Sequence, residues 1–304
     1  MQGQIYRKYP FWSLAGPFLG FLAIQTGVQS IIQLAIELPY LLDAYTELMR
    51  ETAAGSIPAA QEIMDVYVQT AAPALRLIAA HQAEIAAAAS GATLVLTGIL
   101  FAKDRKLEKR CGMMPPGRAS AGKYWMLLVF GAAGSPAATC LMAMAQAAFA
   151  DNAYQQTSAG VYAASFPVQV ICLGILIPLA EEMMFRGILY KRYRERQDFW
   201  YSALCSAILF SFMHTNMTQM VYTFLLGLML AYVYEKFGSF CAPLILHILM
   251  NTVSLVLTWA GGFAFLSRDP LLLAAAAVGG AFICSVMFVL IQRIRPGNTD
   301  PNIG

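Results

Sequence analysis

Two adjacent carboxylates, Glu181 and Glu182, interrupt an apolar stretch between residues 175 and 186. An ionised side chain at the centre of a membrane-spanning helix costs about 2.5–3.5 kcal/mol on insertion scales. On a helix, Glu182 and Arg186 are four residues apart and can form an ion pair, whereas Glu181 lies about 100° away around the axis. We therefore expect Glu181 to need a partner on another helix. The alternative is that the helix ends here and both charges lie at the water boundary.

Three further polar residues lie in apolar runs of the C-terminal half. His214 closes the run 199–213, while His247 and Asn251 lie four residues apart in the run 241–259 and so share one helix face. A lone histidine inside a membrane helix is often hydrogen-bonded to a neighbouring helix without any further role. Two histidines, an acidic pair, an arginine and an asparagine on three apolar segments instead favour one shared polar site.

Spacing along the helices tests whether these residues can lie at one level. Glu182 precedes Asp198 by 16 residues and His214 follows it by 16, which places both about 24 Å from the turn between their helices. His247 lies only about 12–15 Å from the turn before its own helix. The levels therefore agree only if the basic end of the helix that carries Glu182 projects beyond the membrane.

Pro178, with Gly174 one turn earlier, is expected to distort the helix that carries Glu181. Proline removes a backbone N–H and disfavours regular helix, so a kink here is expected to make room for water. The alternative is an ordinary proline of the kind that membrane helices tolerate.

The composition predicts that these segments are helices of a polytopic membrane protein. The chain of 304 residues is 59% hydrophobic and only 12% charged, with a mean hydropathy of +0.59. Soluble domains have about 25% charged residues. Because a spanning helix needs about 20 apolar residues, we predict an all-α fold with about eight transmembrane helices around an intramembrane polar site. The predicted spans are 11–34, 85–102, 125–149, 166–190, 199–213, 217–234, 241–259 and 271–291.

The distribution of lysine and arginine predicts the orientation of the spans. If the N-terminus lies on the cytoplasmic side of the membrane, most basic residues fall on that side, chiefly in the segments 103–124 and 191–196. Only Arg50, Arg76 and Arg268 then fall on the outer side. Cytoplasmic loops are enriched in lysine and arginine. We therefore predict a multi-pass integral membrane protein with both termini cytoplasmic.

Three regions follow from this arrangement. Within the N-terminal region (1–124), residues 43–84 are expected to form short amphipathic helices on the outer surface. Arg7 and Lys8 precede an apolar run with no prompt cleavage site, which indicates an uncleaved anchor. The regions are an N-terminal membrane region with two spans, an outer segment and a basic cytoplasmic loop (1–124), a core of spans three to seven (125–260), and the last span with a cytoplasmic tail (261–304).

Several classes of function are not supported by the sequence. The six cysteines are scattered singly and suggest neither a zinc knuckle nor a disulfide framework. The basic loop is expected to face anionic headgroups of the lipid bilayer, and the chain has no nucleic-acid signature, phosphate-binding glycine loop or GxSxG nucleophile.

Three short motifs follow one another on three predicted spans: Glu181-Glu182-xxx-Arg186, Phe210-xxx-His214 and His247-xxx-Asn251. Together they resemble the signature of the CPBP family, the CAAX prenyl endopeptidases and bacteriocin-processing enzymes also called the Abi group. Each motif alone is weak, but three in this order are fairly specific, and the resemblance covers about residues 125–260. It implies an intramembrane endopeptidase with eight membrane helices and a site open to the cytosol. The implied substrate is a membrane-associated peptide or protein of the CAAX type or the bacteriocin or leader type.

The resemblance also implies a role for each motif residue. A carboxylate removed from water is a stronger general base, and histidine and asparagine N–H groups can stabilise a tetrahedral oxyanion. The implied roles are activation of water by Glu181 beside His214, stabilisation of the oxyanion by His247 and Asn251, and structural support of the site by Glu182 and Arg186.

The need for a metal is left open by the motifs. Glu181, His214 and His247 together can supply three zinc ligands, with a water in the fourth position. However, no HExxH is present, and relatives have been described both as metalloproteases and as glutamate proteases. We expect no required cofactor and assign no metal as first choice, with a divalent metal such as zinc as the alternative.

Two non-proteolytic functions remain as alternatives. One is a non-catalytic membrane scaffold or bacteriocin-immunity protein, in which the polar cluster only holds helices together. The other is a proton-coupled transporter that uses the same glutamate and histidine residues, although the absence of an internal repeat counts against it. A scaffold should tolerate Glu181→Gln, because hydrogen bonding survives that change, whereas an enzyme should not.

Overall fold

The computed structural model describes residues 10–55, 59–111, 118–149, 159–160, 162–214 and 216–294. Within these ranges the chain is helical and contains no β-strand, in agreement with the predicted all-α class. The helices are α1 (Pro10–Ala53), α2 (Ala60–Ala80), α3 (Gln82–Arg110), η1 (Ala121–Tyr124), α4 (Trp125–Phe149), α6 (Phe166–Gln169), η2 (Val170–Leu176), α7 (Ile177–Glu182), η3 (Met183–Tyr190), α8 (Lys191–Arg194), α9 (Phe199–Ser211), α10 (Met217–Phe237), α11 (Cys241–Trp259), α12 (Gly262–Leu266) and α13 (Pro270–Gln292).

The predicted spans correspond to helices of the structure, although α1 and α3 are longer than predicted and α9 does not reach spanning length. In the described part of the chain, seven helices are long and apolar enough to cross a membrane, and α6 to α8 form one of them as a continuous rod over Phe166–Arg194. The fifth predicted span, α9, has only 13 residues. It is therefore about 20 Å long, which is shorter than the roughly 30 Å hydrocarbon core of a bilayer.

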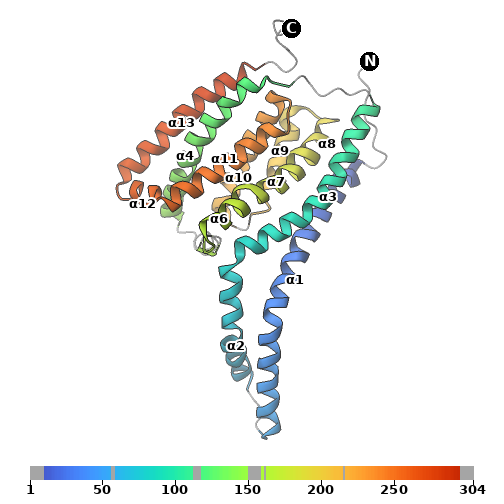
Figure 1. The fold of residues 1–304 in the computed structure, drawn as a ribbon, viewed down its shortest axis with the longest axis vertical. Helices are drawn as coiled ribbons and strands as arrows, with labels where there is room; N and C mark the ends of the chain where they lie inside the picture. Colours follow the sequence, from blue (N-terminus) through green and yellow to red (C-terminus); the bar gives the residue numbers. More distant parts are fainter. Residues whose placement is uncertain are drawn as a thin grey trace.

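The expectation of short surface helices in residues 43–84 is wrong. Instead, α1 continues without a break to Ala53 and accommodates Pro39 within its 44 residues. A single helix of 21 residues, α2, then runs back against α1. Together they form a long hairpin that projects beyond the rest of the bundle (Figure 1). The two helices approach closely through small residues, because Ala44 of α1 and Ala71 and Ala74 of α2 are buried, whereas large apolar side chains such as Leu42 and Met49 stay exposed.

Local sequence signals explain where the helices near the site begin and end. Asp198 and Asn216 cap the first turns of α9 and α10, accepting hydrogen bonds from the backbone N–H groups of Tyr201 and Gln219. Gly238 ends α10 with a left-handed φ of 59°, a conformation that glycine adopts without a side-chain penalty. The α9–α10 hairpin is thus set by ordinary capping residues.

The bundle is assembled from packed helix pairs. In Figure 1, α4 lies beside α13, α9 beside α10, and α1 crosses α3, while α11 packs against α4. Small residues allow close approach, since a Cβ added at Gly280 of α13 would lie 2.7 Å from the Ala137 Cβ of α4. Around η3, one apolar cluster joins Phe21, Met184, Phe185, Ile188, Leu189 and Phe210.

Basic side chains gather at one end of the bundle, which we call the basic end. It contains the start of α1 and the ends of α3, α8, α10 and α13, so segments that are far apart in sequence meet there through charged groups. This grouping is what the predicted orientation requires, although which side of a membrane the end faces stays a prediction. Arg7, Lys8 and the middle of the predicted basic loop (112–117) lie outside the described residues. The ion pairs at the basic end are Lys191–Glu108, Arg192–Asp104 and Arg194–Glu235, and its hydrogen bonds to backbone carbonyls are Arg192 to Ser13 and Lys236 to Gln292.

Candidate active site

The rod that carries Glu181 and Glu182 is not a regular α-helix. Two π-helical segments, η2 and η3, flank the short α7 that contains both glutamates. π-Helical turns are rare in proteins, but those that occur are often found at functional sites, because they change the direction of side chains and release backbone groups. The distortion predicted from Pro178 and Gly174 is therefore present, as π-helix before Glu181.

Pro178 also explains how Asn251 is held. In a π-helical turn a carbonyl accepts from the N–H five residues later, and for Leu173 that residue is Pro178, which has no N–H. The free Leu173 carbonyl instead accepts a hydrogen bond of 3.0 Å from Asn251 Nδ2 on α11. The proline thus supplies the anchor that orients an asparagine on a different helix.

Glu182 and Arg186 form the ion pair expected from their spacing. Arg186 Nη1 lies 2.8 Å from Glu182 Oε1, and both side chains are completely buried. Arg186 also donates to the Gly227 carbonyl of α10 over 3.1 Å, and its guanidinium lies over the Phe210 ring of α9. The pair therefore ties three helices together and shields the Arg186 charge with a carboxylate, a carbonyl and an aromatic face.

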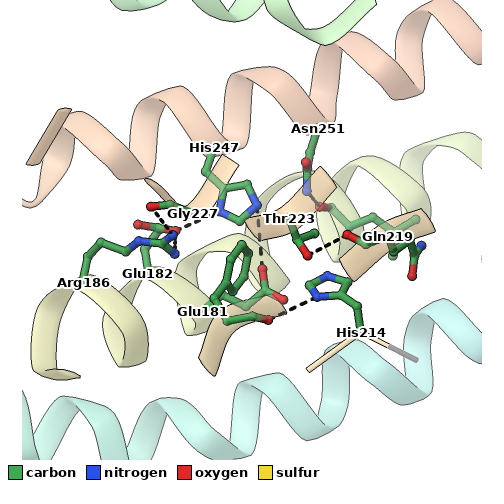
Figure 2. Close-up of polar contacts among 11 residues, drawn as sticks. Glu181, Glu182, Arg186, His214, Gln219, Thr223, Gly227, His247 and Asn251 are labelled. Carbon is green, nitrogen blue, oxygen red and sulfur yellow. Dashed lines mark hydrogen bonds and ion pairs between the residues drawn. The ribbon is translucent and has the colours of Figure 1, made fainter. Parts of the chain in front are cut away.

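His247 lies between the two glutamates (Figure 2). Its Nδ1 is 3.0 Å from Glu182 Oε1, and its Nε2 is 3.7 Å from Glu181 Oε2. An imidazole held through one nitrogen by a carboxylate presents the other nitrogen in a defined direction. Glu182 thus pairs with Arg186 and also orients His247. The spacing of residues along the sequence did not predict this second contact.

His214 lies just beyond the end of α9, in the turn before α10. Its Nδ1 is 3.3 Å from the Phe210 carbonyl, and its ring meets the Phe210 ring edge-on. Phe210 contacts His247 in the same way, with ring centroids 5.9 Å apart. One phenylalanine therefore packs between both histidines, and in Figure 2 the His214 ring lies on the Glu181 side of the site.

Glu181, His214, His247 and Asn251 line one cavity of about 250 Å³. Glu181 retains 17% of its side-chain exposure, unlike the fully buried Glu182. The residues of the site also lie at one level along the helices, since His247 contacts both glutamates although it lies near the start of α11. The other polar residues of the cavity wall are Ser135, Thr139, Tyr162, Gln219, Tyr222, Thr223 and Ser254.

A metal site requires several ligands that converge on one point. Among the described residues, no three histidine, cysteine, aspartate or glutamate side chains are grouped so that they could hold a metal ion. Glu181, His214 and His247 share a cavity wall, but their arrangement does not fit a three-ligand site. That no cofactor is required stays a prediction.

Some participants of the site were not found from the sequence. The carbonyls of Leu173 and Gly227 are backbone acceptors, so no side-chain pattern indicates them. Ser135 of α4 donates to the Met250 carbonyl over 2.6 Å and thereby fixes the cavity wall beside Asn251. The only available signals were the isolated glycine in α10 and the proline five residues after Leu173.

A family model and two curated proteins match the part of the chain that holds this cavity. Residues 163–253 match the model described as type II CAAX prenyl endopeptidase Rce1-like. A putative membrane peptidase of Bacillus subtilis (strain 168), YdiL, is 25% identical over 91 residues, which cover 30% of this chain and 37% of that protein. An uncharacterised 24.3 kDa protein of Escherichia coli is 32% identical over 92 residues, which cover 29% of this chain and 42% of that protein.

These similarities have a limited extent. The chain spans about two fifths of the length of the curated relatives that it matches. No solved structure matches the chain significantly. The matched segment nevertheless includes every residue of the three motifs, from Glu181 to Asn251.

Proposed function

Over residues 163–253 the chain belongs to the family of CAAX prenyl endopeptidases, and on this premise we propose that it is an intramembrane endopeptidase that hydrolyses a peptide bond of a membrane-associated substrate. The observation that carries the proposal is the partly exposed Glu181 carboxylate, which shares a cavity with two imidazoles and an amide. A non-catalytic scaffold does not require a cavity beside its polar residues. The substrate class, of CAAX type or of bacteriocin or leader type, is part of the proposal.

In the proposed reaction, Glu181 acts as the general base. It removes a proton from a water in the cavity as the oxygen attacks the scissile carbonyl carbon, and it later delivers that proton to the leaving amine. His214, on the Glu181 side of the cavity, helps to position the water. Seclusion from bulk water strengthens each of these interactions, because the local dielectric is low.

His247 and Asn251 stabilise the oxyanion that this attack creates. His247 keeps its Nδ1–H on Glu182 and directs Nε2 into the cavity, so it donates from a fixed position. One Nδ2 hydrogen of Asn251 is held by the Leu173 carbonyl, which leaves the other hydrogen for the oxyanion. Glu182 and Arg186 act only through the groups that they position.

The decisive experiment compares cleavage by the parent chain with that by Glu181→Gln. Glutamine keeps the shape and hydrogen-bonding capacity of the side chain but cannot accept a proton as a carboxylate does, so cleavage should fall below detection. Membrane peptides of cells that express either chain are compared by mass spectrometry, and substrates are those whose fragments disappear in the variant. Glu47→Gln, on the exposed part of α1, serves as the matched control and should cut normally.

The alternative functions predict different results for the same variants. A scaffold or immunity protein would retain its phenotype in Glu181→Gln, and an equal yield of fragments from parent and variant would contradict the proteolytic function. A proton-coupled transporter would accumulate a solute in vesicles and produce no fragments from either chain.

A further inference from the structure

A second cavity, of about 370 Å³, lies at the basic end, and we call it the basic cavity. Its wall is formed by the ends of α3 and α10, the start of α8, Arg118, and the turn between α10 and α11. In the described part of the chain, none of its lining residues also lines the cavity that contains Glu181. The reaction proposed above therefore gives the basic cavity no role.

The wall of the basic cavity carries more positive than negative charge. Two carboxylates line it, but that of Glu235 already pairs with Arg194, which is not part of the wall. The other, that of Glu108, is shared, since its Oε1 lies 2.5 Å from both Arg105 Nη2 and Lys191 Nζ. A carboxylate carries one negative charge and offsets only one of these two cations, so the wall attracts an anion. The cations that line the basic cavity are Arg105, Lys109, Arg118 and Lys191.

Several cationic groups of the wall have hydrogen-bond donors that are not used. Arg105 Nε is buried and has no acceptor among the described residues. Lys109 and Arg118 are exposed, and neither forms an ion pair with another described residue. Phosphate oxygens accept charge-assisted hydrogen bonds from guanidinium and ammonium groups. A phosphate group in the basic cavity would thus find donors on α3 and on the segment that precedes η1.

The side of the basic cavity toward the membrane centre is aromatic. Phe101 precedes Glu108 by seven residues on α3 and so lies about 10 Å deeper. Its ring is 5.5 Å from the ring of Phe240, centroid to centroid, and the Arg105 guanidinium lies over it at 5.0 Å. Charged groups above and aromatic rings below match the boundary between the phosphate and the glycerol of a phospholipid. A free phosphate ion would make no use of the rings.

The depth of the basic cavity also favours a lipid over a free ion. The cavity lies at the ends of two helices that are long and apolar enough to cross a membrane, Gln82–Arg110 and Met217–Phe237. The ends of such helices lie at the level of the lipid headgroups. Basic pockets between membrane helices are known to bind headgroups of anionic lipids. Charge, shape and depth therefore agree on one type of ligand.

We propose that the basic cavity binds the phosphate headgroup of an anionic phospholipid from the adjacent leaflet. The lipid contacts Lys191, at the end of the rod that carries Glu182, and also the turn that precedes α11, the helix of His247. It therefore holds together the two elements between which Glu182 and His247 make contact. The proposal is independent of the proposed function, because lipid binding does not require proteolysis.

Thermal unfolding of the purified full chain in a nonionic detergent tests the proposal. The protein is titrated with phosphatidylglycerol, with phosphatidylcholine of the same acyl chains, or with inorganic phosphate, and Tm is followed by helix content. A ligand that binds the native state raises Tm as its concentration rises. We expect phosphatidylglycerol to raise Tm well above the value reached with either of the other two. Added salt should reduce this rise, because it screens exposed charges.

Two matched double variants distinguish the basic cavity from the rest of the basic end. Lys109→Gln with Arg118→Gln removes two cations of the wall, whereas Lys106→Gln with Arg110→Gln removes two exposed cations of α3 that do not line the cavity. Each pair loses one lysine and one arginine, so the change in net charge is the same. Since one cation near an anionic lipid contributes about a fivefold factor, affinity for phosphatidylglycerol should fall about tenfold or more in the first pair and less than about threefold in the second.

Each contrary result overturns the proposal at a defined point. No rise in Tm with phosphatidylglycerol, or an equal loss of affinity in both pairs, would refute binding in the basic cavity. An equal rise with inorganic phosphate would refute a lipid as the ligand and indicate an ion site instead.

Two further variants separate lipid binding from folding and from the proposed function. The charge-conserving pair Lys109→Arg with Arg118→Lys should bind phosphatidylglycerol as the parent does, and equal Tm values without lipid would show that all the pairs are folded. Glu181→Gln should also keep the response to phosphatidylglycerol. Loss of cleavage in that variant and loss of lipid binding in the cavity pair are therefore separate results, and either proposal can fail while the other stands.

Discussion

Asn251 on α11 donates a hydrogen bond of 3.0 Å to the Leu173 carbonyl in the π-helical turn η2. These two residues, 78 positions apart, are joined because Pro178 has no N–H to donate to the Leu173 carbonyl. An irregularity of one helix thus sets the direction of an amide on another. This contact connects the distortion of the rod with the oxyanion function proposed for Asn251.

Pro178→Ala should therefore lower activity without lowering stability. Alanine restores an N–H that competes with Asn251 for the Leu173 carbonyl, and it removes the steric conflict that proline creates inside a helix, which is worth about 3 kcal/mol in regular helices. We expect an unchanged or higher Tm in detergent together with at least about tenfold slower cleavage, since a misplaced oxyanion donor costs about 10²–10³ in rate. A lower Tm with normal cleavage would contradict the role assigned to this proline.

Arg186→Met should destabilise the protein strongly. The change leaves Glu182 buried without its cation, and breaking one partner of a buried ion pair costs about 3–5 kcal/mol. We expect a large fall in the free energy of unfolding, followed by helix content during denaturant titration. The double variant Glu182→Leu with Arg186→Met should recover much of that stability while remaining inactive, because His247 then lacks its Nδ1 acceptor. An inactive but fully stable single variant would show that the pair carries no structural energy.

Gly227→Ala should disturb both the packing of α10 and the position of Arg186. The added Cβ would lie 3.0 Å from the Ala207 Cβ and 3.2 Å from Arg186 Nη2, which is tighter than ordinary contact. Overpacking of this kind costs about 1–3 kcal/mol. Gly98→Ala is the matched control, because nothing lies within 4 Å of its added Cβ and alanine favours the helix by up to about 1 kcal/mol. Opposite shifts in Tm for the two variants are the expected result.

Removal of metal ions should leave cleavage intact. The described residues contain no three-ligand group, and Glu181 suffices as a base in the proposed reaction. Purified protein is dialysed exhaustively against a chelator, its metal content is measured by elemental analysis, and the cleavage rate is compared with that of the untreated sample. A rate that falls on chelation and recovers with zinc, but not with magnesium, would assign Glu181, His214 and His247 to a metal after all.

Several features follow from the sequence because they depend on local geometry alone. The spacing of Glu182 and Arg186 on a helix brings their side chains together whatever surrounds them, and the predicted pair is present. Apolar runs of about 20 residues must be helical in a bilayer, where backbone groups have no other partners. The three motifs on the fourth, fifth and seventh predicted spans were similarly sufficient to predict that Glu181, His214, His247 and Asn251 line one site.

Other features were decided only by the tertiary structure, because they depend on how helices rotate and slide against one another. His247 contacts both glutamates, although its distance from the preceding turn left its level open. The hairpin of α1 and α2 replaces the expected surface helices, since a helix continues wherever packing supplies a partner for its apolar face. The sequence determined which polar residues share a membrane region, whereas the packing of α9, α10 and α11 around the rod determined which of them are in contact.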